Sequence, residues 1–107
     1  MRFQGRPEGF LMGCGAAATV KTDKSGNPKL EDGKQVFTCS RGLILITPDN
    51  GVDRQVFISA FKVPAFFEIG REYTIRGNSW ITPFTMNGRQ SMSVLADEIV
   101  PVVGDQS

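Results

Sequence analysis

The chain of 107 residues has no histidine and only two cysteines, Cys14 and Cys39, which do not form a Cys-x-x-Cys pair. Structural zinc sites take their ligands from clusters of cysteine and histidine, so we expect no metal site. A disulfide between the two cysteines is geometrically conceivable if their strands pair. Two buried free thiols are the stronger expectation for a cytosolic protein, and neither cysteine is assigned any chemistry.

The chain also lacks a long hydrophobic run. No apolar stretch approaches the roughly 20 residues that a membrane helix needs, and the run Phe10-Leu-Met ends at Gly13. We therefore expect neither a membrane span nor a signal-peptide core, and we expect a cytoplasmic protein. A hydrophobic content of 40% and a charged content of 21% are typical of a folded protein. A chain of 107 residues is large enough for a single domain with one hydrophobic core.

A strong charge of either sign is missing as well, since the formal net charge is +1. Three acidic residues, Asp97, Glu98 and Asp105, follow residue 96, whereas every lysine and arginine precedes it. The remaining part of the chain has a modest basic surplus. An evenly solvated surface explains this surplus as well as a surface for polyanions does.

Catalytic motifs are not found either. Without histidine, acid–base catalysis would rest on carboxylates, and the neighbours Asp97 and Glu98 would point to opposite faces of a strand. The chain contains no P-loop, no Gly-x-Ser-x-Gly motif and no dinucleotide fingerprint. We expect that the protein is not an enzyme and holds no cofactor.

What the sequence does contain is a series of β-like segments between turn signals. The segments cover residues 9–21, 34–47, 54–62, 72–82 and 90–102. The turn signals are the polar loop 23–33, Pro48–Gly51 and Met86–Gly88. The connection Val63–Gly70 has an early proline, an apolar cluster and a final glycine, which predicts a short helix or helical turn.

Three strands, a helical connection and a two-strand hairpin are the element order of the OB-fold, a five-stranded Greek-key barrel. An SH3-like barrel or a small sandwich is the alternative. We predict an all-β fold in which residues 1–8 are a flexible leader, 9–102 the OB-fold domain and 103–107 a short tail. The core is expected to contain Phe10, Phe66, Phe67, Tyr73 and Ile75.

The last predicted hairpin carries the most informative pattern. Strand alternation puts Tyr73 and Ile75 on one face and Arg76 and Trp80 on the other. In segment 54–62 both faces carry apolar groups, so Phe57 and Phe61 must lie under the connection, in a subunit interface or in a ligand groove. Phe37 shares a predicted face with Cys39 and Arg41, and it raises the same question.

The order of these segments resembles the bacterial and phage single-stranded DNA-binding protein family, over roughly residues 9–102. The similar features are the turn at Ser25-Gly26, the strand Arg54-Gln-Val-Phe-Ile-Ser-Ala-Phe and the connection from Ala65 to Gly70. Gly70-Arg-Glu-Tyr-Thr-Ile-Arg-Gly, Asn87-Gly-Arg and Val94-Leu-Ala-Asp-Glu-Ile resemble that family's last two strands. Members of the family have the OB-fold.

The resemblance implies a sequence-tolerant binder of single-stranded DNA that protects the strand during replication, recombination or transfer. Bacterial members end in a long tail with an acidic tip, whereas here only Gly104-Asp-Gln-Ser follows. This difference points to a compact phage- or plasmid-like member that acts as a homodimer or small oligomer. Base stacking alone does not distinguish DNA from RNA.

Single-strand binders stack bases on aromatic rings and contact phosphates with lysine and arginine. The predicted stacking residues are Trp80, Phe57 and Phe37, with Phe61 and Phe84 in reserve. The predicted phosphate contacts are Arg76, Arg41, Arg54, Lys34 and Arg89.

Each of these residues also has a plainer interpretation. Trp80 could be a core residue, and the phenylalanines could pack under a loop or across a dimer. Arg76 and Arg41 could pair with Glu72 or Asp53. The alternative function is a structural or assembly β-barrel whose exposed aromatics form a protein interface.

Overall fold

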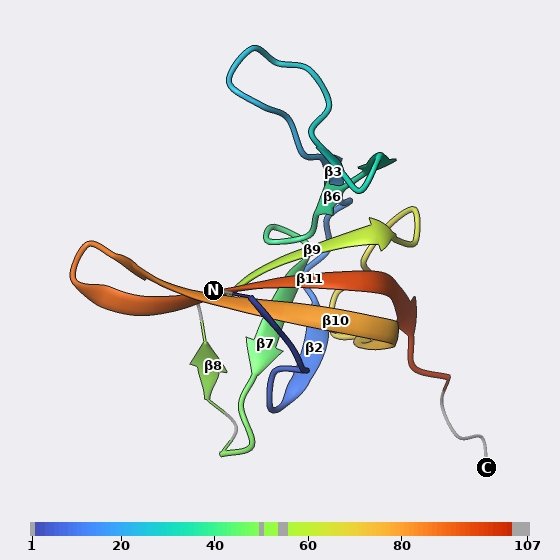
Figure 1. The fold of residues 1–107 in the computed structure, drawn as a ribbon. Coiled ribbons are helices and arrows are strands. Elements are labelled where there is room, and N and C mark those ends of the chain that lie inside the picture. Colours follow the sequence, from blue (N-terminus) through green and yellow to red (C-terminus); the bar gives the residue numbers. More distant parts are fainter. Residues whose placement is uncertain (1, 50, 54–55, 104–107) are drawn as a thin grey trace.

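The structure is a computed structural model that describes residues 2–49, 51–53 and 56–103. Within these ranges the chain forms strands, turns and loops but no helix (Figure 1). The predicted all-β class is therefore confirmed. In chain order the strands are β1 (Phe3–Gln4), β2 (Phe10–Gly13), β3 (Thr19–Val20), β4 (Leu30–Glu31), β5 (Lys34–Gln35), β6 (Phe37–Thr38), β7 (Leu43–Ile46), β8 (Val52–Asp53), β9 (Val56–Lys62), β10 (Glu72–Met86) and β11 (Arg89–Pro101).

Most of these strands belong to one sheet. Its strands follow the order β3-β6-β9-β11-β10-β2-β7-β8, with β1 added to β10, while β4 and β5 form a separate hairpin. Among the described strands, β9 and β11 pair in parallel and the other neighbours are antiparallel. The loop between β3 and β4, drawn in blue to cyan, projects from the sheet, with the hairpin of β4 and β5 beside it (Figure 1). We call residues 21–36 the finger.

The sheet curls toward itself because three continuous segments of the chain, called runs below, each contribute one strand near each of the two ends of the strand order. The run 10–20 contains β2 and β3, the run 37–46 contains β6 and β7, and the run 52–62 contains β8 and β9. The same three runs are therefore neighbours in the same order at each end of the sheet. The result is a curled half-barrel, visible in Figure 1, and this shape is compatible with a β-barrel.

The core fills the inside of this curl. Ile58 of β9 and Val94 of β11 are paired neighbours and are almost completely buried. Tyr73 and Ile75, predicted for the core, are 2% and 7% exposed, and Phe67 is fully buried. The ring of Phe67 meets that of Tyr73 edge to face at a centroid distance of 5.1 Å. These core predictions are confirmed.

The predicted helical connection is wrong. Residues 63–71 contain a bend at Ala65, an isolated β-bridge at Phe67 and a turn at Ile69–Gly70. The N–H of Phe67 donates to Ala16 O at 2.9 Å, and its carbonyl accepts from Gly15 N–H at 3.0 Å. Because Phe67 inserts into the core while pairing with the first run, a helix there would lose both contacts. Its neighbour Phe66, also predicted for the core, is 50% exposed instead, and Phe10 is half-buried.

The long hairpin of β10 and β11 has the predicted turn. Asn87 and Gly88 both have positive φ, 52° and 76°, as the tight turns that match strand twist require. β10 continues to Met86 rather than ending at Thr82. Among the described strands β10 pairs beyond Ile81 with β11 alone, so Pro83, which has no N–H to donate, is tolerated there.

The remaining expectations concern the leader and the cysteines. In the expected leader, Phe3 and Gln4 form β1 and pair with Ile81 and Trp80 of β10. Both cysteines are free, but only Cys39 is buried, whereas Cys14 is exposed. Burial raises the pKa of the Cys39 thiol to about 12, so this thiol stays protonated at neutral pH.

Candidate functional site

One face of β9, β11 and β10 collects aromatic side chains. Residues that pair directly across strands share a face of the sheet. One row joins Ser59, Leu95 and Trp80, and the next row joins Phe57, Ser93 and Thr82. The buried residues Ile58 and Val94 lie between these rows in sequence and face the core. The aromatic rows therefore face away from the core.

We call this surface the outer stripe. Its aromatic residues are Phe57, Phe61, Trp80 and Phe84, each of which is half-buried. The Phe57 and Phe84 rings lie 5.9 Å apart between centroids, with their planes inclined at 34°. The two residues in the row of Trp80, Ser59 and Leu95, are nearly buried, at 7% and 9% exposure. The rings thus lie over the strands while part of each remains accessible.

Basic side chains lie at both ends of the outer stripe. At one end the register pairs Met86 with Arg89, one row beyond the pair of Phe84 with Ser91, so Arg89 shares the stripe's face. At the other end Arg76 pairs with Glu98. The Arg76 side chain is 73% exposed, and its Nε lies 4.0 Å from Glu98 Oε1. Such an exposed ion pair is weak, so Arg76 remains available to another anion.

The Arg76 end of the stripe opens into a groove of about 770 Å³. Its lining residues are Lys34, Gln35, Phe37, Phe61, Lys62, Arg76, Gly77, Asp97 and Glu98. Lys34 Nζ lies 5.5 Å from the centre of the Phe61 ring, within the range of a cation–π contact. A second hollow of about 580 Å³ shares Phe37, Phe61, Lys62 and Glu98 with the groove. The groove thus combines aromatic rings with three cationic and two anionic side chains.

One of the two carboxylates in the groove has a structural partner. Asp97 Oδ2 accepts the backbone N–H of Asn78 at 2.9 Å. Gly77 and Asn78 form a bulge in β10, since the register shifts between Arg76 and Ser79. Gly77 has φ of 90°, and a Cβ added there would lie 2.8 Å from Asp97 Oδ2. Glycine is therefore required at this point, and Asp97 is held beside the bulge.

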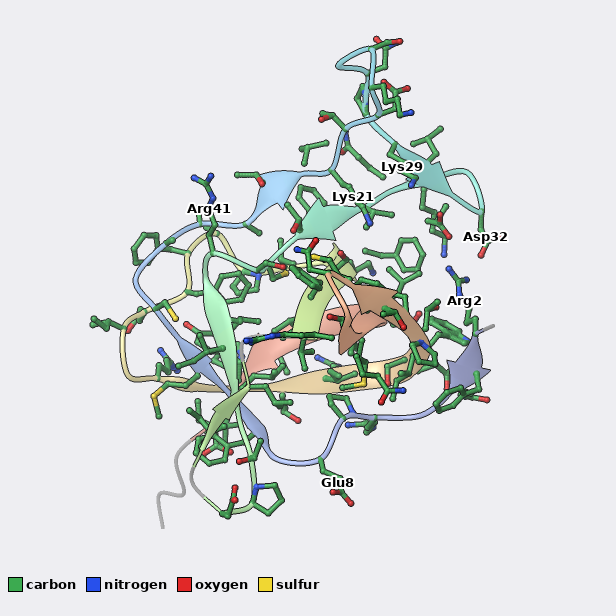
Figure 2. All side chains as sticks on the ribbon, turned by 90° about the vertical axis from the view of Figure 1, so that its left-hand side faces the viewer. Arg2, Glu8, Lys21, Lys29, Asp32 and Arg41 are labelled. Atoms are coloured by element: carbon green, nitrogen blue, oxygen red, sulfur yellow. The ribbon has the colours of Figure 1, made fainter. Side chains whose placement is uncertain are left out.

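The finger adds lysines near this end of the molecule. Lys29 N–H donates to Lys21 O at 2.8 Å, which brings its two sides together. Arg2 of the leader reaches Glu31 on the finger, with Nη2 3.2 Å from Oε1. Figure 2 shows Lys21, Lys29 and Arg2 on one side of the view and Arg41 on the other. Asp32 lies on the same side of that view, so the finger and the leader carry charges of both signs.

Of the predicted site residues, the structure brings six together. Trp80, Phe57 and Arg89 lie on the outer stripe, Arg76 lies at its groove end, and Phe37 and Lys34 line the groove. The reserve residues Phe61 and Phe84 belong to the same stripe.

Two predicted phosphate contacts do not join this surface. Arg41 was expected on one strand face with Phe37 and Cys39, but β6 ends at Thr38. Arg41 lies instead in an exposed turn, where Cys39 O accepts the N–H groups of Gly42 and Leu43, both at 2.9 Å. Arg54 lies outside the described residues. In the alternative interpretation Arg76 would pair with Glu72 or Asp53; in the structure the carboxylate near it is that of Glu98.

Lys62 and the bulge were missed by sequence reasoning. Lys62 pairs with Glu98 across the parallel strands and lines the groove. The signal for the bulge was a Gly-Asn step inside a strand pattern, since glycine in a strand interior often marks one. No sequence signal placed β9 next to β11, which is the contact that brings Phe57 and Phe61 beside the hairpin.

One other carboxyl has a shifted pKa. The hydroxyl of Thr47 and the backbone N–H of Gly51 hold the pKa of the Asp49 carboxyl below its usual value, in an exposed turn. No cluster of three or more potential metal ligands occurs among the residues that the structure describes. In the same part of the chain no helix is long and apolar enough to cross a membrane.

Comparisons with known proteins give no further guidance. No family model, no curated protein and no solved structure matches this chain.

Proposed function

We propose that this protein binds single-stranded DNA with little sequence preference. The observation that carries the proposal is the outer stripe, a continuous face on which Phe84, Phe57, Trp80 and Phe61 follow one another between Arg89 and the basic groove. Unpaired bases expose flat faces that stack on such rings, and each stacked base contributes about 1–3 kcal/mol of binding free energy.

The charges at the two ends of the stripe fit the same ligand. Arg89 stands at one end, and Arg76, Lys34 and Lys62 stand at the other. Phosphates of a strand laid along the stripe would meet cations at both ends while its bases face the rings. Glu98 and Asp97 reduce the local positive charge, so stacking rather than charge should supply most of the affinity.

The path of the chain supports an OB-type barrel as the scaffold. Three successive runs pair in order, the third run lies parallel to β11, and β10 pairs with both β11 and β2. A five-run Greek-key barrel has this order and closes most of its own sheet edges. Such barrels commonly use a strand face and the adjoining loops for oligonucleotides.

We further propose the biological setting that the family resemblance implies. A compact binder of this type would coat single strands in the cytoplasm of a bacterial cell during replication, recombination or transfer, encoded by a phage or plasmid. Phe66 and Ile69, which are 50% and 79% exposed outside the stripe, are candidates for the contact between subunits of a homodimer or small oligomer.

The same two exposed side chains favour the competing function, a structural β-barrel that assembles with other proteins. On that alternative the stripe would be a protein interface as well. The two functions differ in their response to nucleic acid, because only the first predicts that a single strand reaches the rings.

Titration with oligo-dT tests the proposal through Trp80, the single tryptophan of the chain. Quenching of its fluorescence at low salt, with an affinity that falls as salt rises, is expected. About three to four phosphate contacts predict a slope of log K against log salt of roughly −2 to −3, at about −0.7 per contact for single strands. Absence of quenching at low salt, or quenching that does not depend on salt, would contradict the proposal. A titration with oligo-rU measures the preference between DNA and RNA.

A further inference from the structure

The edge of β10 that faces away from β11 is paired in two separate places. β2 pairs with Glu72 and Tyr73, and β1 pairs with Trp80 and Ile81. No described strand pairs with this edge between Tyr73 and Trp80. Backbone carbonyls in such an interval take their hydrogen-bond donors from water or from a side chain, because no strand supplies them.

Arg6 supplies these donors from a side chain. Its Nη1 donates to Ile75 O at 2.9 Å, and its Nη2 donates to Gly77 O at 3.0 Å. The preceding residue of the leader binds the next carbonyl on the same edge of β10, since Gly5 N–H donates to Ser79 O at 3.0 Å. One planar guanidinium thus replaces two backbone donors of a missing strand, and its fixed geometry suits this task better than a single ammonium does.

These contacts hold the bulge that separates Arg76 from Trp80. On the β11 side Asp97 accepts the N–H of Asn78 at 2.9 Å, and on the leader side Gln4 Nε2 donates to Asn78 Oδ1, also at 2.9 Å. Arg6 binds the carbonyl of Gly77, the other bulge residue. The bulge is therefore fixed from both of its sides.

We infer that Arg6 is a positioning residue of the outer stripe, which sets the distance and direction between the Arg76 guanidinium and the Trp80 ring by holding the bulge. This inference rests on the proposed function, because the two groups must serve the same strand, one through a phosphate and the other through a base. Arg6 itself contacts the β10 edge rather than the stripe, and its role differs from that of a phosphate ligand.

The first test uses the free protein, so it does not depend on nucleic acid. Hydrogen exchange of the Asn78 amide is measured by NMR in the wild type, Arg6→Ala, Arg6→Lys and the control Arg71→Ala. Arg71 is an exposed arginine just before β10 that pairs with Glu68. We expect exchange about tenfold faster in both Arg6 variants and unchanged in the control. Wild-type exchange in Arg6→Ala would overturn the inference. If Arg6→Ala does not fold, the exchange rate of the Asn78 amide in Arg6→Lys, which keeps the charge and the aliphatic stem, decides whether Arg6 holds the bulge.

The second test measures oligo-dT affinity and its salt dependence for the same variants. Misplacement of Trp80 is expected to weaken binding about fivefold, which corresponds to the low end of the contribution of one stacked base, with the salt slope unchanged. If Arg6 were a phosphate ligand, the slope would fall by about 0.7 and Arg6→Lys would keep most of the affinity. That result would overturn the positioning role. If the wild type does not bind oligo-dT, the proposed function fails, while the exchange experiment still decides whether Arg6 holds the bulge.

Discussion

Replacement of Trp80 by alanine separates a binding role of this residue from a packing role. The indole of Trp80 lies half-buried on the outer stripe. The backbone of Trp80 pairs with Leu95 on one side and with Gln4 on the other. The variant removes a ring on which a base could stack. It also uncovers part of Leu95, which is 9% exposed in the intact protein.

The two effects have different magnitudes. Loss of one stacked base costs about 1–3 kcal/mol, which corresponds to a loss of affinity of roughly 5-fold to 150-fold. Truncation of a fully buried tryptophan costs about 3–5 kcal/mol of folding free energy, and a half-buried ring should cost roughly half of that. For a domain of this size a destabilisation of about 2 kcal/mol lowers Tm by roughly 8–16 °C. The variant should therefore remain folded at 25 °C while binding weakly.

The assay must not depend on tryptophan, because Trp80→Ala removes the only one. Fluorescence anisotropy of a labelled oligo-dT gives the affinity, and thermal unfolding followed by circular dichroism gives Tm. Trp80→Phe should retain most of the binding because it keeps a ring. Val103→Ala, which truncates an apolar side chain that is 80% exposed after the end of β11 and outside the stripe, should bind like the wild type. Wild-type affinity in folded Trp80→Ala would refute the stacking role. Loss of the fold in both Trp80 variants would assign the residue to packing.

Three further predictions concern charge, backbone and thiol. Arg76→Ala should reduce the slope of log K against log salt by about 0.7, measured by anisotropy at several salt concentrations; an unchanged slope would exclude a phosphate contact. Gly77→Ala should destabilise the fold by more than Gly88→Ala, because both positions have positive φ but only Gly77 would place a Cβ against the carboxylate of Asp97. Urea unfolding measures the difference in unfolding free energy, and an equal loss in both variants would contradict the role of Asp97. The pKa of the Cys39 thiol is higher in the folded than in the unfolded protein, so the folding free energy from this thiol is complete below about pH 9 and should be lost as the pH rises toward 12. Cys39→Ala should lose this alkaline dependence of stability in unfolding experiments. The same pH profile in both proteins would contradict the prediction.

The closing hairpin could be predicted from the sequence because its determinants are local. Alternating β-forming residues and the Asn87-Gly88 pair specify two strands and their turn. The faces of Tyr73, Ile75 and Trp80 follow from parity alone. The prediction of an all-β chain rests on the same local signals, repeated along the sequence.

The connection and the second strand could not be predicted in this way, because distant contacts override their local pattern. Pro64 and Gly70 resemble the ends of a helix, but Phe67 enters the core and pairs with Ala16. A continuous strand over residues 34–47 is interrupted by a turn at 39–42, where Cys39 O accepts the N–H groups of Gly42 and Leu43. A Cβ on Gly42 would lie 2.4 Å from the Phe67 ring, so the same buried phenylalanine packs against this turn.

The candidate site could be predicted only in part, for the same reason. Strand alternation identifies the side chains on outward faces, and it predicts Trp80, Phe57 and Arg76 as site residues. Their arrangement depends on the parallel pairing of β9 with β11, which joins residues far apart in the chain. Arg41 was misassigned because the strand that would have carried it turns at Cys39.

The most direct test of the outer stripe as the binding surface is an NMR titration of the labelled protein with oligo-dT at low salt. We predict that the largest shifts affect the Trp80 indole and the rings of Phe57, Phe61 and Phe84, together with the backbone amides of their rows. Shifts that are absent, or that are confined to the surface around Phe66, would contradict the account.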